Sequence, residues 1–424
     1  MNRKKVMKKR INTFSALLLA LLFAVTQVTG CGKAPAGAAA GKTAGEMTGA
    51  AAEAAGKVPA GVSEEVPAGV PMLPGLDYVS SMETYYAEAF RIHTYRLKEG
   101  EGELCRLIDV PGSGQYLLLP EGTQGIPDLP ETVTVFSGPP ECLYVAATSS
   151  MALFEAAGAL SQVKLTGTRE DGWYIDAPRE ALKNGSMVYA GKYSAPDYEL
   201  LKSSGCGLAV ESMMILHTPE VKEKLEELGI PVFIDTSSTE SHPLGRTEWV
   251  RLYGVLTGHE EEAEAFFEKQ KAEFARTAEY RDTGKTAAFF SISSVGNVIV
   301  RASDDYIPRM IGLAGGSYVF EELLSENGNS ASVRLTMEEF YNTAKDADFL
   351  IYNATIDDPV RSLDDLCCRS SLLSEFRAVK SGTVWQVQKN LYQSPDIAAE
   401  MITDIHRMLT GEDTEHMVFL SPVR

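Results

Sequence analysis

The chain has 424 residues, 44% of them apolar, and its 58 acidic and 39 basic side chains give a formal net charge of −19. Such an excess of negative charge argues against nucleic acid as a partner. The roughly 350 residues after position 74 exceed what one small core needs and suit two lobes.

Residues 1–30 form a predicted targeting segment. Six basic residues precede the apolar run SALLLALLFAV, which is too short for a permanent membrane span. The segment ends in Val28-Thr29-Gly30 before Cys31, and small residues up to a cysteine resemble the lipobox of bacterial lipoproteins. The resemblance implies cleavage before Cys31 and lipid attachment to its sulfur, which would give stable anchoring at the extracytoplasmic face of the cell membrane. The alternative is an ordinary secretory signal with a chance cysteine.

Residues 31–74 consist largely of Ala, Gly, Pro and Thr and contain almost no bulky side chains. This composition cannot bury enough apolar surface to fold, so it predicts a flexible stalk. A tract that is removed with the signal is the alternative. The five cysteines beyond Cys31 are odd in number and form no CxxC motif, which predicts buried thiols and leaves one bridge open as an alternative.

Residues 75–256 show the pattern of a first α/β lobe. Two alternating runs, Leu104–Val110 and Gln115–Leu119, flank Pro-Gly-Ser-Gly and predict a hairpin. Further on, Leu143–Ala147 reads as a buried strand, and Met151–Leu160 as a helix. The hydroxyls between them, Ser149 and Ser150, are either helix caps or contacts to a ligand in the crevice beyond the strand ends.

The later part of this lobe carries a family resemblance. Its order is YAGKYSAPDYELL, the strand LAVE, the helix EKLEELGIPV and then LYGVLTGHEEEAEAF, with Ser194 expected to cap the helix that contains Glu199. This order resembles the class III substrate-binding proteins of bacterial ABC importers, which bind iron-siderophores, haem or cobalamin. The family usually has Pro-Asp before the strand where this chain has Cys206-Gly207, so the chain resembles a divergent member.

Residues 257–281 predict one long helix that joins the lobes. Thr257 and Glu260 fit a capping pattern, and apolar residues such as Phe267 and Phe274 recur at helical spacing. Residues 282–410 then repeat the alternation of strands and helices, and residues 411–424 are an uninformative tail. The fold class is therefore α/β, with two Rossmann-like lobes, parallel sheets and a ligand cleft between the lobes.

The resemblance also implies partners, an ABC permease and its ATPase. In the family, one surface glutamate from each lobe pairs with arginines of the permease. By position these glutamates correspond to Glu199 in the first lobe and to Glu339, or alternatively Glu338, in the second. The other reading is that these acids only favour the positive start of a helix.

Ligand contacts are expected from loops at the strand ends. Arg301 suits an anionic group of a ligand, unless it only pairs with Asp304 or Asp305 in solvent. Tyr193, Tyr306 and Trp173 are either stacking surfaces for a flat ligand or core residues. The full candidate set is Ser149, Ser150, Tyr193, Met213 and Ser237 from the first lobe, with Arg301, Tyr306, Asn353 and Gln393 from the second.

Other functions find less support in the sequence. The six histidines are scattered without the spacing of a metal site, and no GxSxG, P-loop or HExxH motif points to catalysis or a cofactor. The sequence thus predicts a monomeric, lipid-anchored binding protein that passes a ferric siderophore, haem or a corrinoid to a permease. The rival is a surface-attached adhesion module that uses the same fold without transport.

Overall fold

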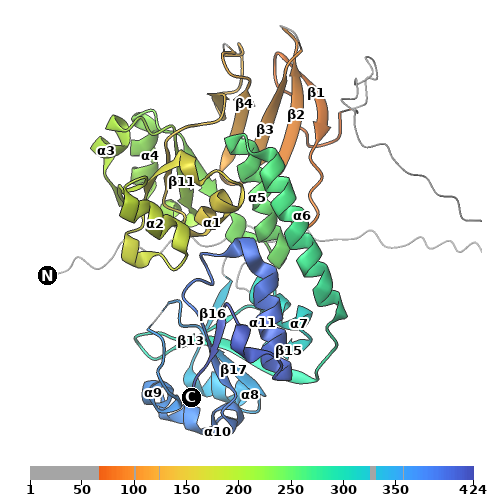
Figure 1. Ribbon diagram of the computed structural model, residues 1–424, viewed down its shortest axis with the longest axis vertical. Helices are drawn as coiled ribbons and strands as arrows, with labels where there is room; N and C mark the ends of the chain where they lie inside the picture. The colour runs from red at the N-terminus through yellow and green to blue at the C-terminus, as the bar shows by residue number, and fades with distance from the viewer. Residues whose placement is uncertain (1–65, 100–101, 124, 325–330, 357) are drawn as a thin grey trace, which may run out of the picture. The chain divides into compact units, whose positions relative to one another are not determined.

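The computed structural model describes residues 66–99, 102–123, 125–324, 331–356 and 358–424, all within one compact unit, Glu65–Arg424 (Figure 1). The predicted signal segment, Cys31 and the stalk up to residue 65 lie outside the described residues. Leu73 is buried beside Leu76, so the fold includes the last residues of the predicted stalk. Among the residues described, no helix is both long and apolar enough to cross a bilayer.

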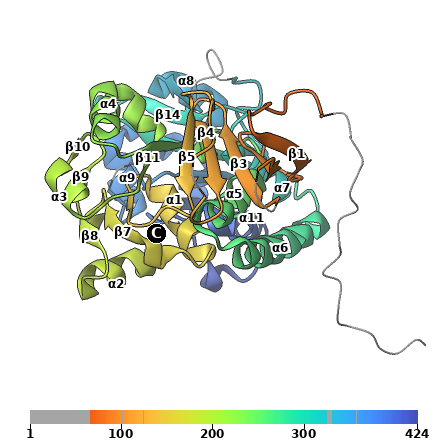
Figure 2. The same cartoon turned by 90° about the horizontal axis from the view of Figure 1, so that it is seen from above.

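An N-terminal sheet of five strands comes first, in the order β1-β2-β3-β4-β5 (Figure 2). The pairs are antiparallel except β4 and β5, which are parallel. The predicted hairpin is confirmed as β3 and β4, but the sequence did not reveal the strands on either side of it. The strands are β1 (Leu76–Ser81), β2 (Arg91–Leu97), β3 (Leu104–Val110), β4 (Gly114–Leu119) and β5 (Val133–Ser137).

The first lobe contains a parallel sheet in the order β12-β11-β6-β7-β8. One face of this sheet packs with Trp249 and Tyr253, and the other with Leu201 and Leu225. The strands are β6 (Leu143–Val145), β7 (Val163–Thr166), β8 (Val188–Tyr189), β11 (Leu208–Ser212) and β12 (Val232–Asp235), with the small hairpin β9 (Gly191–Lys192) and β10 (Ala195–Pro196) beside them. The helices are α1 (Thr148–Ala156), α2 (Asp176–Asn184), α3 (Tyr198–Ser203), α4 (Pro219–Glu227) and α5 (Pro243–Thr257).

The hairpin turn of the N-terminal sheet covers the outer edge of β12. The Tyr116 hydroxyl donates to the carbonyl of Val232 at 2.8 Å, and the Ile234 N–H donates to the Ser113 hydroxyl at 2.7 Å. These contacts satisfy backbone groups that an unprotected edge strand would expose.

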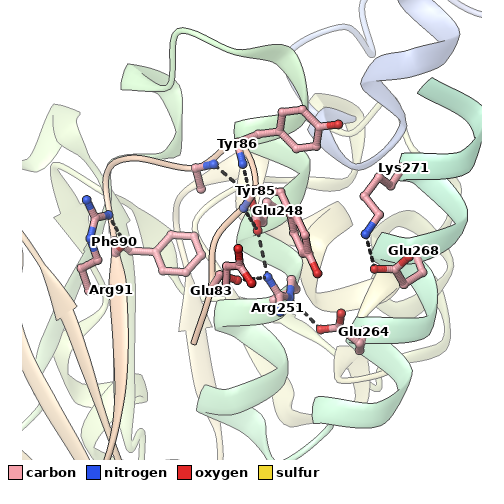
Figure 3. A network of polar contacts seen from close by, with 11 residues as sticks. Glu83, Tyr85, Tyr86, Phe90, Arg91, Glu248, Arg251, Glu264, Glu268 and Lys271 are labelled. Carbon is pink, nitrogen blue, oxygen red and sulfur yellow. Dashed lines mark hydrogen bonds and ion pairs between the residues drawn. The ribbon is translucent and has the colours of Figure 1, made fainter. Parts of the chain in front are cut away.

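Segment 82–90, between β1 and β2, attaches the N-terminal sheet to α5 (Figure 3). The N–H groups of Tyr85, Tyr86 and Ala87 donate to the carboxylate of Glu248 at 2.7–3.1 Å. Glu248 also pairs with Arg251, one turn further along the same helix. A fully buried carboxylate is tolerable here because charge-assisted hydrogen bonds surround it.

The second lobe contains a mixed sheet in the order β16-β14-β13-β17-β18-β19, with β15 also paired to β13. The pairs of β13 with β15 and β17, and of β17 with β18, are parallel, whereas β14, β16 and β19 pair antiparallel. The predicted tail is therefore part of the lobe, because it supplies β19. The strands are β13 (Lys285–Ile292), β14 (Val298–Arg301), β15 (Gly316–Tyr318), β16 (Ser332–Leu335), β17 (Phe349–Tyr352), β18 (Val384–Val387) and β19 (Leu420–Pro422).

The helices of the second lobe are α7 (Tyr306–Leu313), α8 (Met337–Ala344), α9 (Leu363–Arg369), α10 (Arg377–Ser381) and α11 (Ala398–Thr410). Asp305 caps the start of α7, and its side chain accepts a hydrogen bond from the Ile307 N–H. All five cysteines beyond Cys31 are free thiols, as predicted, but only Cys105 and Cys206 are buried.

Helix α6 (Glu260–Arg276) joins the lobes but is shorter than the predicted helix 257–281. Thr257 does not cap it. Its hydroxyl donates to the Tyr253 carbonyl at 2.6 Å as the last residue of α5, and Gly258, with a φ of +77°, ends that helix. Beyond Arg276 the chain continues as a short 3-10 turn.

Helix α5 is the more deeply buried of the two, because all of its residues are buried whereas α6 buries only Ala263, Phe267 and Gln270. α5 contacts α1 of the first lobe and both α7 and α11 of the second, and α6 runs beside α5 and also reaches α11 (Figure 1). Both helices therefore contact both lobes.

Candidate functional site

Loops that follow parallel strands of the two sheets meet at the junction of the lobes. The loop after β18 carries Gln393, whose Oε1 accepts from the Tyr174 N–H and whose Nε2 donates to the Gly172 carbonyl, both at 2.8 Å. Gly172 and Tyr174 lie in the loop that follows β7 of the first lobe. We call these two hydrogen bonds the interlobe clamp. Since ligands of open α/β sheets bind beyond the carboxyl ends of the strands, the space beside the clamp is the candidate site.

A second link between the lobes lies close to the clamp in sequence. The hydroxyl of Thr247 in α5 donates to the carbonyl of Pro395 at 2.7 Å. Gln393 was expected to contact ligand, but both ends of its amide are engaged in the clamp. Its place in the fold is thus at the junction of the lobes.

Ser150 lies inside the first lobe. Its hydroxyl donates to Asp235 at 2.5 Å, and the Tyr253 hydroxyl donates to the same carboxylate oxygen at 2.6 Å. The predicted capping role is wrong, because α1 begins at Thr148 and no side chain caps it. Ser149 remains partly exposed at the start of the helix.

Ser237 follows β12 in a short 3-10 turn that packs against α5. The side-chain oxygens of Ser237 and of its neighbour Thr236 are buried and have no hydrogen-bond partner within the described part of the chain. Buried hydroxyls without partners are unusual in a folded protein, so these two mark a polar surface able to accept a ligand group or water.

Arg301 is already paired. Its Nε and Nη2 donate to the two carboxylate oxygens of Asp305 at 2.9 and 2.5 Å, and its Nη1 donates to Ser332 at 3.1 Å. Although burial opposes the charged form, the hydrogen bonds and charge of Asp305 raise the pKa of Arg301. Arg301 was expected either to contact an anionic ligand group or to pair with Asp304 or Asp305 in solvent. The structure shows an ion pair with Asp305, and this pair is largely buried.

Arg246 is a charged residue at the junction that the sequence did not single out. Its guanidinium carbon lies 4.3 Å from the ring centre of Tyr306, which belongs to α7 of the second lobe. Arg246 is 5% exposed and Tyr306 is 3% exposed, and the Arg246 Nε and the Tyr306 hydroxyl both lack a hydrogen-bond partner among the described residues. Burial raises the pKa of Tyr306 to about 12, so its hydroxyl keeps its proton at neutral pH.

The remaining candidates are placed differently. Asn353 uses its amide internally, donating to the Tyr392 hydroxyl at 3.0 Å and accepting from Thr355. Trp173 is buried, and its Nε1 donates to the Thr168 carbonyl at 3.3 Å, so it is a core residue. Tyr193 lies half-buried in the turn between β9 and β10.

Large apolar side chains are exposed at the carboxyl ends of both sheets. Met213, which was expected to contact ligand, is one of three on the short 3-10 helix after β11. We call this set the apolar rim: Tyr174, Met213, Met214 and Leu216 from the first lobe, and Val295 and Ile356 from the loops after β13 and β17. Exposed large apolar side chains in the loops at the carboxyl ends of the strands are suited to contact a ligand or a partner.

The site combines this rim with polar groups at the junction of the lobes. A separate pocket of about 400 Å³ lies between Ser241 of the first lobe and Asp304, Arg309 and Tyr318 of the second, and no residue of the rim or the clamp lines it. Within the described ranges, no cluster of three His, Cys, Asp or Glu residues could hold a metal ion. The arrangement suits a ligand that is apolar over much of its surface and carries polar or charged groups.

The two predicted docking helices present their acids at equivalent positions. Glu199 is the second residue of α3, after the cap Asp197, and Glu338 is the second residue of α8, after the cap Thr336. Glu339 instead closes a capping box, in which its carboxylate accepts from the N–H of Thr336 at 2.7 Å and from its hydroxyl at 2.8 Å. These hydrogen bonds lower the pKa of Glu339.

No family model matches the chain. An uncharacterised lipoprotein of Methanocaldococcus jannaschii is 23% identical over 321 residues, which span 70% of this chain and 74% of that protein. A periplasmic haem-binding protein of Vibrio cholerae aligns with 64% of this chain and 98% of its own, with a TM-score of 0.51 and 15% identity. An ABC-type Fe³⁺-hydroxamate transport protein of Saccharomonospora viridis aligns with 64% of this chain and 94% of its own, with a TM-score of 0.51 and 17% identity.

This chain has the two-lobed α/β fold of periplasmic binding proteins. The predicted fold class is confirmed, and the structural neighbours are named as binding and transport proteins, not as enzymes. The class III resemblance of the sequence and the fold of the structure therefore agree.

Proposed function

We propose that this chain is the membrane-anchored, solute-binding component of an ABC importer and that it binds an iron complex, haem or a corrinoid between its lobes. The observation that carries the proposal is the meeting of loops at the carboxyl ends of both sheets, where the two lobes are hydrogen-bonded and large apolar side chains are exposed. The neighbours that bind haem and transport Fe³⁺-hydroxamate have the same fold. Fold alone does not set a ligand, so the loop side chains decide which of the three classes is bound.

A thermal-shift screen of the full chain in detergent tests the ligand. The probes are a ferric siderophore, haemin and cyanocobalamin. A probe at a hundred times its dissociation constant stabilises the native state by about 2.7 kcal/mol, which appears as a higher melting temperature. If none of the three classes raises the melting temperature, the importer proposal fails and the adhesion module is favoured.

Docking to the permease is proposed to use Glu199 and Glu338. Both are exposed at the second position of their helices, where a carboxylate can form a weak, reversible ion pair with an arginine, whereas Glu339 is engaged in its capping box. Glu199→Arg and Glu338→Arg are expected to abolish uptake by cells while ligand affinity stays unchanged. Glu220→Arg and Asp364→Arg are the matched controls, since these exposed acids also stand at the second position of a helix. Normal uptake by the first two variants would contradict the docking proposal.

Anchoring is proposed to occur through Cys31, in keeping with the lipoprotein name of the similar archaeal protein. Cys31→Ser is expected to shift the protein from the membrane fraction to the soluble fraction. Mass spectrometry of the N-terminal peptide provides the direct check, since a lipid-modified cysteine at position 31 is required.

A further inference from the structure

Arg246 is a buried cation that forms no ion pair within the described part of the chain. Within the ranges that the structure describes, its guanidinium forms neither an ion pair nor a hydrogen bond with a protein acceptor, and its Nε is fully buried. Arg251, on the same helix, pairs with Glu248 and Glu264. Burying an unpaired charge is strongly unfavourable, so an arginine in this state calls for an anion that arrives with a ligand.

Among the described residues, the side chains stacked near Arg246 are a tyrosine and an arginine that already has its own carboxylate partner. Tyr306, against which the guanidinium stacks, has an unpartnered hydroxyl that stays protonated. Arg301 lies 5.9 Å from the same ring, and Asp305 neutralises it. The arginine stacked on Tyr306 therefore leaves one net positive charge where α5 of the first lobe meets α7 of the second.

We propose that Arg246 and Tyr306 bind a planar pair of anionic oxygens on the ligand, such as a carboxylate or two catecholate oxygens; this inference rests on the proposed solute-binding function. Stacking on the ring covers one face of the guanidinium, and the Nε is fully buried, so the two Nη groups are the donors that a ligand can reach. Together they present two parallel N–H donors, which match two oxygens in one plane. The Tyr306 hydroxyl supplies a third donor.

The binding test compares probes that differ in exposed anionic oxygens. The full chain in detergent is titrated with haemin, with its dimethyl ester, in which both carboxylates are masked, with ferric enterobactin, a catecholate complex, and with ferrioxamine B, a hydroxamate complex. Because hydrogen bonds to charged groups are strong, Arg246→Gln should weaken haemin or ferric enterobactin at least about tenfold. The same variant should change the affinity for the ester and for ferrioxamine B by less than about twofold. Loss with haemin assigns a carboxylate, and loss with ferric enterobactin assigns catecholate oxygens.

Several outcomes would overturn the inference. It fails if Arg246→Gln binds both anionic probes as tightly as the native chain does. It also fails if the native chain binds only the ester or ferrioxamine B, a result that leaves the solute-binding function standing. If the native chain binds none of the four probes, the anion site is refuted, and binding of cyanocobalamin then decides whether the broader function survives.

A measurement without ligand separates binding from a structural role. Because Arg246→Gln removes an uncompensated buried charge, the ligand-free variant should melt at or above the temperature of the native chain. Arg251→Gln is the control and should melt lower, since it leaves the buried Glu248 without its cation. If Arg246→Gln lowers the melting temperature as much as the control does, the guanidinium is a structural cation and the inference is wrong.

Discussion

Replacing Glu248 by glutamine should weaken the attachment of the N-terminal sheet to α5 (Figure 3). The carboxylate is fully buried, accepts three backbone N–H groups and pairs with Arg251 at 2.9 Å. The amide keeps one acceptor oxygen but turns the other into a donor that faces N–H groups. Breaking a buried ion pair by removing one partner costs roughly 3–5 kcal/mol, so we expect a loss of that size in the free energy of unfolding.

Glu264→Gln is the matched control, because Glu264 accepts from the Nε of the same Arg251 at 2.7 Å. Its side chain is 42% exposed, so solvent screens the pair and the expected loss is about 0–1 kcal/mol. The two variants thus remove one carboxylate each from a shared arginine and differ mainly in burial.

Urea unfolding followed by tryptophan fluorescence measures both losses. Trp249 is buried next to Glu248 in sequence, and its indole donates to Glu240, which binds the N–H groups of Glu88 and Ala89. The chain also contains Trp173 and Trp385, so the variants are made in a Trp173→Phe, Trp385→Phe background in which Trp249 alone reports on this attachment. Equal midpoints for Glu248→Gln and Glu264→Gln would show that burial does not set the strength of this network, and the reasoning would fall.

Three further predictions concern the clamp, a buried acid and the packing of α5. Gln393→Ala should weaken the association of the two lobes by about 1–3 kcal/mol, which stopped-flow measurements would show as faster ligand release. Gln388→Ala, at an exposed position in the same loop, should leave the rate of ligand release unchanged. Burial raises the pKa of Glu211 from 4.5 to about 8, so its contribution to stability is complete below about pH 4.5 and is lost as the pH rises through 8. The melting temperature should therefore fall between pH 5 and pH 9. Glu211→Gln should make the melting temperature less dependent on pH over this range. Gly254→Ala would place its Cβ 2.4 Å from a side chain of α6 and should lower stability by about 1–3 kcal/mol, whereas Gly312→Ala meets open space and should be neutral or stabilising in the same melts.

The alternation of strands and helices could be predicted from the sequence because each unit has a local pattern. The predicted strand LAVE matches β11 closely, and the runs Leu104–Val110 and Gln115–Leu119 match β3 and β4. The start of α6 could not be predicted, because Thr257 and Glu260 fit a capping pattern while Gly258 also fits the end of the preceding helix. Only the packed structure decides between these two local signals.

The site was harder to predict because its features depend on contacts distant in sequence. Nothing local distinguishes Arg246 from Arg251, yet Arg251 has two carboxylate partners and Arg246 has none among the residues described. For Arg301, the sequence left both a ligand contact and an ion pair open. Only the structure shows that Asp305 accepts hydrogen bonds from its Nε and Nη2. A single sequence gives the type of a side chain but not whether its hydrogen bonds are already made.

The interlobe clamp has an implication for redesigning this receptor. Gln393 hydrogen-bonds only to main-chain atoms of Gly172 and Tyr174. The interlobe clamp therefore depends on the side chain at position 393 and on the backbone conformation of the opposite loop. Mutational drift at position 174 would leave the two hydrogen bonds in place as long as that conformation is kept. A library that varies residue 174 could therefore change the ligand specificity without breaking the hydrogen bonds between the two lobes.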